Sequence, residues 1–160
     1  VIGYEKFVAY ASDCGVDGVL LVDLPPEEAK DLDVVLQKYN MDQIFLLAPT
    51  STDERIEHVV KQASVFIYYV SLKGVTGAAT LDTAEVAARI EKIKTFTDIP
   101  VGVGFGINDA ASAKAVGAVA DAVIVGSAFV KPFANLAPEQ AVELAVNKVK
   151  ELRAALDELV

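Results

Sequence analysis

Two glycine-rich stretches decide the fold, Val101-Gly-Val-Gly-Phe-Gly106 and, about twenty residues later, Val123-Ile-Val-Gly-Ser-Ala128. Each is an apolar run that ends in small residues, at the point where a strand would meet the following loop. Glycine in such a place either relieves strain in a tight turn or lets another group come close to the main chain. The two stretches therefore raise the question of what approaches the backbone there.

Short apolar segments rich in β-forming residues recur along the chain and predict strands. None of them alternates polar with apolar residues, a pattern typical of parallel strands that are covered on both faces. The five predicted strands are 18–22, 43–48, 65–70, 100–104 and 122–125.

The segments between these strands carry helical patterns. Apolar residues within 32–39 recur at helical spacing, and Ser51, Asp82 and Asn108 stand where an N-cap would begin a helix. The last helix is predicted over about 138–159. Its apolar side is expected to consist of Ala145, Val149, Leu152, Leu156 and Leu159.

Strict alternation of strands and helices over residues 1–160 predicts one α/β domain with a parallel sheet. A flat, doubly wound sheet and part of a barrel both fit this order. Glycine-rich ends on two successive late strands favour the barrel, because (β/α)8 barrels build a phosphate site after their last two strands. A closed barrel of this kind has eight strands, whereas the sequence supplies five. The fold predicted is a partial (β/α)8 TIM barrel.

Composition excludes several classes of function. The charge is 14 − 23 = −9, which disfavours binding to nucleic acid or to anionic membranes. The sequence has no basic cluster, no metal-ligand spacing and no apolar run of the roughly 18 residues that a membrane span needs. Its only histidine, His58, is expected to be a solvated helix residue, and one cysteine excludes an internal disulfide. A cytoplasmic protein without a bound metal is expected.

In a parallel βα array, the carboxyl ends of the strands and the starts of the helices meet at one edge, where function collects. Gly106 and Gly126-Ser127 fall there and suit an anion site, because backbone N–H groups at a helix start attract phosphate and glycine leaves room for it. Ordinary turn glycines are the alternative. The long connection 71–81 suggests a lid. Tyr68 either points into the barrel mouth or packs in the core, and Asp23 is either catalytic or holds its loop.

Five motifs at the strand ends resemble, in order, those of the tryptophan synthase α chain family. They are Val19-Leu-Leu-Val-Asp-Leu-Pro-Pro-Glu-Glu28, Ile44-Phe-Leu-Leu-Ala-Pro-Thr50, Tyr68-Tyr-Val-Ser-Leu-Lys-Gly-Val-Thr-Gly77, Val103-Gly-Phe-Gly-Ile107 and Val125-Gly-Ser-Ala-Phe-Val-Lys131. The family is a (β/α)8 barrel that cleaves indole-3-glycerol phosphate to indole and glyceraldehyde 3-phosphate. The resemblance implies that this chain supplies barrel strands four to eight and that the first three strands lie upstream.

The resemblance also implies roles for individual residues. Phosphate would be bound at Gly77, Gly106, Gly126 and Ser127, and Phe105 would flank the substrate. As auxiliary residues, Tyr68 would line the pocket near the indole, and Thr76 would help to position a catalytic carboxylate.

The family's catalytic glutamate and aspartate would precede residue 1, so no catalytic residue is expected in this chain and the fragment is expected to be inactive alone. The partner implied is a β chain in an α2β2 complex. That β chain, and not this chain, carries pyridoxal phosphate.

Two other functions remain open from the residues alone. One is another phosphate-binding barrel, such as a sugar-phosphate epimerase or an aldolase. The other is a half-barrel binding module without catalysis, whose open edges and apolar lining would need self-association to cover them.

Overall fold

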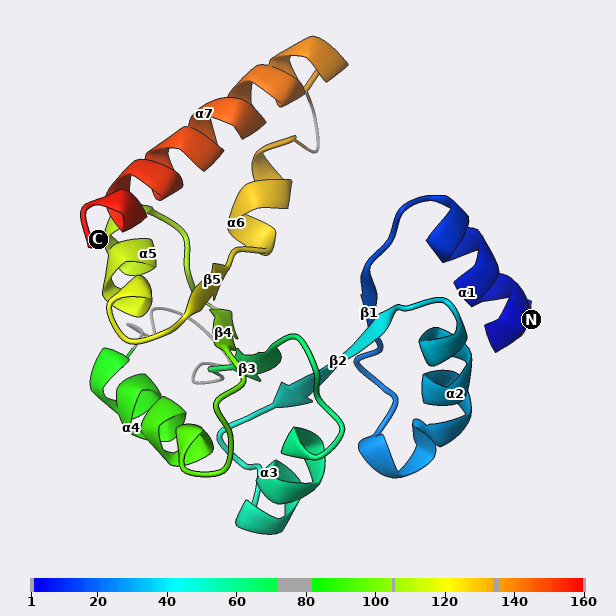
Figure 1. The fold of residues 1–160 in the computed structure, drawn as a ribbon. Helices are drawn as coiled ribbons and strands as arrows, with labels where there is room; N and C mark the ends of the chain where they lie inside the picture. Colours follow the sequence, from blue (N-terminus) through cyan, green and yellow to red (C-terminus); the bar gives the residue numbers. More distant parts are fainter. Residues whose placement is uncertain (1, 72–81, 105, 134–135, 160) are drawn as a thin grey trace.

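The chain forms a curved sheet of five parallel strands in sequential order, β1-β2-β3-β4-β5. The structure is a computed structural model that describes residues 2–71, 82–104, 106–133 and 136–159 (Figure 1). A doubly wound sheet would reverse its strand order at a switch point, so the sequential order identifies a partial (β/α)8 barrel and confirms the predicted fold. The strands are β1 (Gly18–Leu20), β2 (Asp42–Leu47), β3 (Ile67–Val70), β4 (Val101–Gly104) and β5 (Ala122–Ile124).

The longer helices lie outside the curve of the sheet (Figure 1). The main ones follow the prediction, and two short elements after β5 and one after β1 were not predicted. The α-helices are α1 (Tyr4–Asp13), α2 (Lys30–Lys38), α3 (Asp53–Val60), α4 (Thr83–Lys94), α5 (Ala110–Gly117), α6 (Ser127–Val130) and α7 (Pro138–Asp157). The 3-10 helices are η1 (Pro26–Glu28) and η2 (Lys131–Phe133).

The main core lies between the sheet and this outer layer of helices. Alternate residues of β2, β3 and β4 are buried there, including Leu47, Tyr69 and Val103, and they meet Ile90 of α4 and Val116 of α5. A second cluster joins β1 to α1 and α2 around Val8, Val19, Leu32 and Leu36. The strand side chains that face outward therefore pack against the helices.

The inner side of the sheet is covered differently from what the sequence suggested. Leu46, Phe66 and Tyr68 alternate with buried residues and are partly exposed, as is Ile124, while Leu20 is 37% exposed. All four residues of β4, in contrast, are buried. The expectation that both faces are covered therefore holds at β4 and is wrong at the other strands of the described chain.

Two helix caps lie one residue later than the sequence indicated. The Ser51 hydroxyl accepts from the Ala48 N–H at 3.0 Å, so Thr52 caps α3 instead and accepts from the Arg55 N–H at 3.3 Å. Asp109 rather than Asn108 caps α5, because its carboxylate accepts from the Ser112 N–H at 2.8 Å. Asp82 caps α4 as predicted.

Helix α7 packs on α5 through its second half. A Cβ at Gly117, the last residue of α5, would lie against the side chain of Leu156, so glycine allows the two helices to come close. Leu152 is buried in this contact and the Leu159 side chain also lies beside Gly117, whereas Val149 is 51% exposed. The predicted apolar side of α7 is therefore wrong at Val149.

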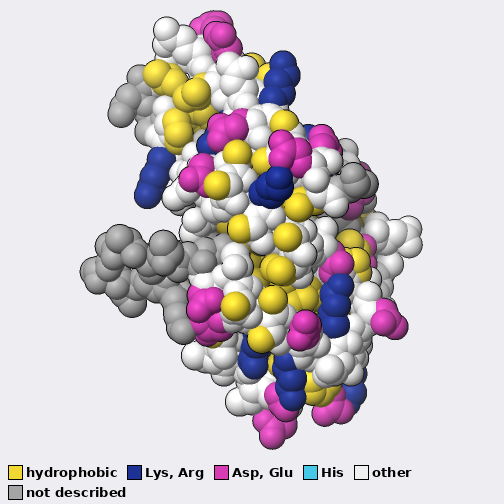
Figure 2. All heavy atoms as spheres, turned by 90° about the vertical axis from the view of Figure 1, so that its left-hand side faces the viewer, with side chains coloured by type: hydrophobic (Ala, Val, Ile, Leu, Met, Phe, Trp, Pro, Cys, Tyr) yellow, Lys and Arg dark blue, Asp and Glu magenta, His cyan; other side chains and the backbone are white. Residues whose placement is uncertain are grey.

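Charged and apolar side chains alternate on the outer surface formed by the helices on the left of Figure 1. Figure 2 shows this surface, where Lys and Arg lie beside Asp and Glu instead of gathering in a patch of one sign. In the part of the chain that the structure describes, no helix is long and apolar enough to span a bilayer.

Candidate functional site

The two glycine-rich stretches lie side by side at the carboxyl edge of the sheet. Strands β4 and β5 pair in parallel with Gly102 opposite Ala122 and Gly104 opposite Ile124. Gly106 and Gly126 each stand two residues beyond that last pair, and Gly106 turns the chain with a left-handed φ of 75°. The turns after the two strands therefore begin at the same level of the sheet.

The glycines within β4 make room for side chains of neighbouring strands. A Cβ at Gly104 would lie 2.7 Å from Cε2 and 2.8 Å from Cζ of Tyr68, closer than real Cβ atoms come. A Cβ at Gly102 would lie 3.1 Å from Cδ1 of Ile124. The group that approaches the backbone at Gly104 is thus the phenol ring of Tyr68.

Gly126 has a different environment. A Cβ built there would meet no described atom within 4 Å. Gly126 is the N-cap of α6, and no side chain among the described residues caps that helix start. Ser127, the first residue of α6, is exposed. The main chain at Gly126 and Ser127 is therefore open to a ligand from outside.

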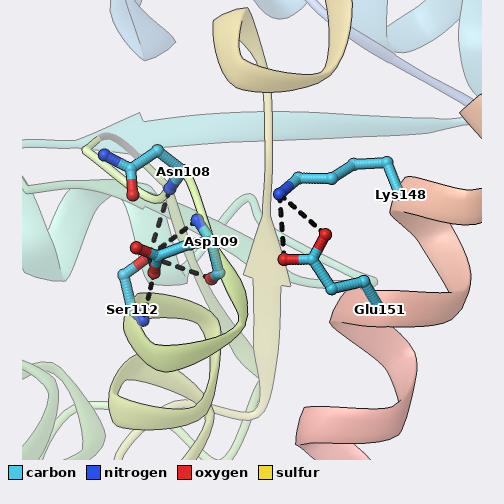
Figure 3. A network of polar contacts seen from close by, with 5 residues as sticks. All are labelled: Asn108, Asp109, Ser112, Lys148 and Glu151. Carbon is cyan, nitrogen blue, oxygen red and sulfur yellow. Dashed lines mark hydrogen bonds and ion pairs between the residues drawn. The ribbon is translucent and has the colours of Figure 1, made fainter. Parts of the chain in front are cut away.

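The start of α5, next to Gly106, is closed by the chain's own groups (Figure 3). The Asn108 and Asp109 N–H groups donate to Ser112 Oγ at 3.1 and 3.2 Å. The Ser112 N–H and hydroxyl donate to Asp109 Oδ1 at 2.8 and 2.7 Å. These bonds use the N–H groups of Asn108, Asp109 and Ser112, so these three are not free to bind an anion. The Gly106 turn stands directly before this capped helix start.

Tyr68 stands on the inner side of β3, while its neighbour Tyr69 is buried in the helix-side core. Its hydroxyl lies over Gly104, and partial burial raises the pKa of Tyr68. The Ser71 N–H donates to the Gly104 carbonyl oxygen at 3.1 Å, which ties the end of β3 to the end of β4. Tyr68 is therefore fixed on the concave side of the sheet next to the candidate site.

Three of the predicted site residues, Thr76, Gly77 and Phe105, lie outside the described residues. Gly106, Gly126 and Ser127 are described and lie at one edge of the sheet, with Tyr68 on the inner side of the adjacent strand.

At the other end of the sheet, Asp23 follows β1 and is exposed. It lines a pocket of about 280 Å³ together with Pro25, Pro26 and Arg55. The Arg55 Nη1 donates to both carboxylate oxygens of Glu27, at 2.7 and 2.8 Å, so Glu27 and not Asp23 ties this loop to α3. Two hydrogen bonds to the Glu27 carboxylate lower its pKa, the larger contribution from the backbone N–H of Glu27 and the smaller from Arg55.

Neither a metal site nor a catalytic histidine emerges from the described residues. Among them, no group of three or more His, Cys, Asp or Glu side chains could hold a metal ion. His58 is partly exposed on α3 and shares a 2.8 Å hydrogen bond with Gln62, two residues beyond the end of that helix. The described groups left open at this edge of the sheet are main-chain atoms at Gly126 and Ser127.

Sequence reasoning missed the short helix α6 and the closed start of α5. Four residues of α6 are too few for a periodic pattern to appear. The spacing of Asp109 and Ser112, three residues apart before an apolar stretch, is the signal that could have identified the capping box.

Comparisons with known proteins match the whole chain to one family. The family model "Tryptophan synthase alpha chain" matches residues 1–159. Tryptophan synthase alpha chains of Acinetobacter baylyi and Acinetobacter baumannii are 82% and 78% identical over 160 residues, which are all of this chain and 60% of each relative. The chain thus spans about three fifths of the length of these relatives.

Solved structures agree with the sequence comparison. Tryptophan synthase subunit alpha from Legionella pneumophila superposes with a TM-score of 0.83 at 33% identity, over 98% of this chain and 58% of that one. A chain of the tryptophan synthase α2β2 complex from Pyrococcus furiosus superposes with a TM-score of 0.81 at 33% identity, over 95% of this chain and 61% of that one.

Proposed function

The chain belongs to the tryptophan synthase alpha chain family, and we propose that in the full-length protein it forms the phosphate-binding side of a lyase. The full-length protein is this chain extended upstream to the length of its relatives. The reaction proposed is the retro-aldol cleavage of indole-3-glycerol phosphate to indole and glyceraldehyde 3-phosphate, a step of tryptophan biosynthesis. Family membership removes the alternative of a sugar-phosphate epimerase or aldolase.

One observation carries the proposal. Among the described residues, no atom lies within 4 Å of a Cβ built at Gly126 and no side chain caps the helix start there, and this helix start stands beside the Gly106 turn. Main-chain N–H groups at such a start bind a phosphate dianion without requiring a cationic side chain. This mode of binding suits a chain whose own charge is −9. A short extra helix after the last strand is also where (β/α)8 barrels hold phosphate.

The other site residues take the roles that the family resemblance implies. Gly77 would add a further main-chain contact to the phosphate, and Phe105 would flank the substrate. Tyr68 would line the indole end of the pocket, which fits its place on the inner side of β3. Thr76 would help to position a catalytic carboxylate. These assignments rest on the motifs that the residues occupy.

The acids that perform the chemistry are proposed to lie upstream of residue 1. In the retro-aldol step, C3 of the indole gains a proton and the glycerol hydroxyl on the attached carbon loses one. The bond between C3 and that carbon breaks, which gives indole and an aldehyde. Both proton transfers need carboxyl groups of suitable pKa in contact with the substrate. The fragment is therefore proposed to bind phosphate and to lack catalytic activity.

The partner proposed is a tryptophan synthase β chain. The Pyrococcus furiosus structure that resembles this chain is named as an α2β2 complex. In such a complex pyridoxal phosphate would belong to the β chain, and this chain would need no cofactor of its own. The compartment proposed is the cytoplasm.

Release of indole from indole-3-glycerol phosphate tests the proposal. The full-length protein is expected to release indole, and the 160-residue chain is expected to release none. Turnover by the 160-residue chain alone would refute the upstream assignment of the acids. In the full-length protein, Gly126→Val is expected to raise KM, because its side chain fills the space proposed for phosphate. An unchanged KM in this variant would refute the phosphate site.

A further inference from the structure

Ser71 is one of two polar side chains that the described part of the chain buries, and it is 7% exposed. The other, Gln43, lies at the amino end of β2, whereas Ser71 follows directly after β3 at the carboxyl edge of the sheet. Polar groups in a folded core are nearly always hydrogen-bonded, because an unbound one has lost its contacts with water. The partner of the buried Ser71 hydroxyl therefore indicates the role of this serine.

The Ser71 N–H and the Ser71 hydroxyl both donate to the carbonyl oxygen of Gly104. The nitrogen lies 3.1 Å from that oxygen and the hydroxyl oxygen lies 3.3 Å from it. Val70 and Gly104 form the last pair of the ladder between β3 and β4, so the first bond extends this ladder by one residue. A carbonyl oxygen has two lone pairs and can accept both bonds. Ser71 thus attaches the end of β4 to β3 by a main-chain bond and a side-chain bond.

Gly104 depends on such attachments, because the backbone of glycine is freer than that of other residues. Its inner side lies against the ring of Tyr68, and its carbonyl group is bound by Ser71. Since the peptide unit is planar, the direction of this carbonyl sets the direction in which the chain leaves β4. Two residues of the β3 end therefore fix both the position of Gly104 and the direction of the chain after it.

The turn that follows Gly104 is also anchored at its other end. Gly106 has a left-handed φ of 75°, and Ile107, directly after it, is 4% exposed and packs in the core. Gly106 therefore lies between two fixed residues, Gly104 and Ile107. A rotation of the Gly104 carbonyl has to be absorbed between them, and it would redirect the main chain at Gly106.

We infer that Ser71 is a positioning residue for the Gly106 turn and acts through the Gly104 carbonyl. The inference rests on the proposed phosphate site, of which that turn forms one part. The Ser71 hydroxyl holds the carbonyl in one direction, and the main chain at Gly106 is thereby kept in the direction that phosphate requires. The hydroxyl is bound within the protein and acts without touching the ligand.

The test uses the full-length protein with inorganic phosphate as the probe. Ser71→Ala removes the hydroxyl, and Ser71→Cys keeps a side chain of similar size that donates only weakly. Both are expected to weaken phosphate binding about threefold, which corresponds to the loss of one neutral hydrogen bond. If Ser71→Ala does not fold, Ser71→Cys, which fills the same space, carries the test.

Ser51→Ala is the matched control. The Ser51 hydroxyl also binds the main chain at the carboxyl end of a neighbouring strand, where it accepts from the Ala48 N–H at 3.0 Å. It does not contact β4 or the Gly106 turn through any hydrogen bond found among the described residues. Ser51→Ala is therefore expected to lose stability and to bind phosphate as the wild type does.

Two further readouts separate positioning from simple stabilisation. In both Ser71 variants the Gly106 amide NMR signal is expected to move even without phosphate. KM for indole-3-glycerol phosphate is expected to rise while kcat is retained, because the phosphate group is held equally in the ground state and in the transition state. A variant that had only lost stability would unfold at lower temperature without either change, as expected for Ser51→Ala.

The outcomes are distinguishable. If the wild type binds phosphate and Ser71→Ala binds it equally well, or if Ser51→Ala weakens binding by the same factor, the positioning role is overturned while the phosphate site stands. Wild-type affinity in Ser71→Cys would also overturn it, because the size of the side chain and not its hydrogen bond would then matter. If the wild type does not bind phosphate, the proposed site fails and this inference fails with it.

Discussion

Gly104 and Gly126 stand at the ends of two adjacent parallel strands, yet the chain uses them for different purposes. At Gly104 the missing side chain is replaced by the ring of Tyr68, which lies against the backbone. At Gly126 no described atom takes that space. The helix starts that follow differ in the same way, because α5 is closed by Asp109 and Ser112 and α6 has no side-chain cap in the described chain.

This difference teaches that a glycine-rich strand end is not by itself a binding site. Only a glycine whose free space remains unfilled in the folded chain can admit a ligand. By that criterion Gly126 is the stronger candidate of the two, and Gly104 serves the packing of the inner face. Matched substitutions at the two positions should separate packing from binding.

The largest effect is expected from Gly104→Ala compared with Gly126→Ala. In Gly104→Ala the new methyl group would displace the Tyr68 ring, which should lower the free energy of unfolding by about 1–3 kcal/mol. Gly126→Ala meets no described atom, so its unfolding free energy should stay within about 0.5 kcal/mol of the wild type. Denaturant unfolding of the full-length variants measures both. Equal losses at the two positions would contradict the distinction.

A double-mutant cycle sharpens the assignment of Tyr68. Combining Gly104→Ala with Tyr68→Ala removes the ring that the new methyl group would meet. The double variant should therefore be less destabilised than the sum of the single variants, with a coupling of about 1 kcal/mol or more. Additive effects, measured by the same unfolding experiment, would show that the ring and Gly104 do not interact.

The comparison extends to the opposite edge of the sheet, where β4 and β5 begin. Charged groups rather than glycines connect the two strands there. Asp121 Oδ2 accepts from the Val101 N–H at 2.8 Å and lies 2.8 Å from the Lys94 ammonium. Burial raises the pKa of Asp121, but Lys94 and the Val101 N–H lower it more, so the pKa is lowered overall. Asp121→Asn should cost about 1 kcal/mol at neutral pH, a value reduced for solvent screening.

The lowered pKa fixes the direction of the pH dependence. The stability that Asp121 contributes is fully present above the pKa of an unfolded aspartate, which is about 3.9. This stability is lost as the pH falls through the lower pKa of the folded state. The difference in stability between wild type and Asp121→Asn should therefore shrink as the pH drops below about 4. Asp98→Asn, at an exposed position, is the control and should show no such trend.

A smaller effect should distinguish the two helix starts. Ser112→Ala removes the acceptor of two N–H groups and should lower the unfolding free energy by about 1 kcal/mol. Ser127→Ala, at the start of α6, removes no cap and should change it by less than about 0.5 kcal/mol. Thermal unfolding of the two variants compares them directly. A larger loss at Ser127 would mean that α6 is capped after all.

The sequence predicts the fold well because the relevant signals are local. Apolar runs place all five strands, and Asp82 marks a helix start that the structure confirms. The caps predicted at Ser51 and Asn108 are wrong by one residue, because in each case the next residue can also cap a helix. The Ser51 hydroxyl already accepts from the Ala48 N–H, and the Asp109 carboxylate accepts from the Ser112 N–H. The exposure of Val149 depends on how α7 packs on α5, which helical spacing alone does not determine.

The site is predicted less completely, for a physical reason. Gly104 and Gly126 look alike in the sequence because glycine carries no side chain to distinguish them. What separates them is a residue 36 positions earlier in the chain, Tyr68, which the sheet brings against Gly104 and not against Gly126. Only the paired strands reveal that difference.

The most direct measurement is an amide NMR titration of the full-length protein with inorganic phosphate. We expect the signals of Gly106, Gly126 and Ser127 to shift together with a single dissociation constant, while the Asn108 and Asp109 amides, already bound to Ser112, move little. Unmoved signals at Gly126 and Ser127, or shifts there that saturate separately from Gly106, would contradict a phosphate site shared by the two turns.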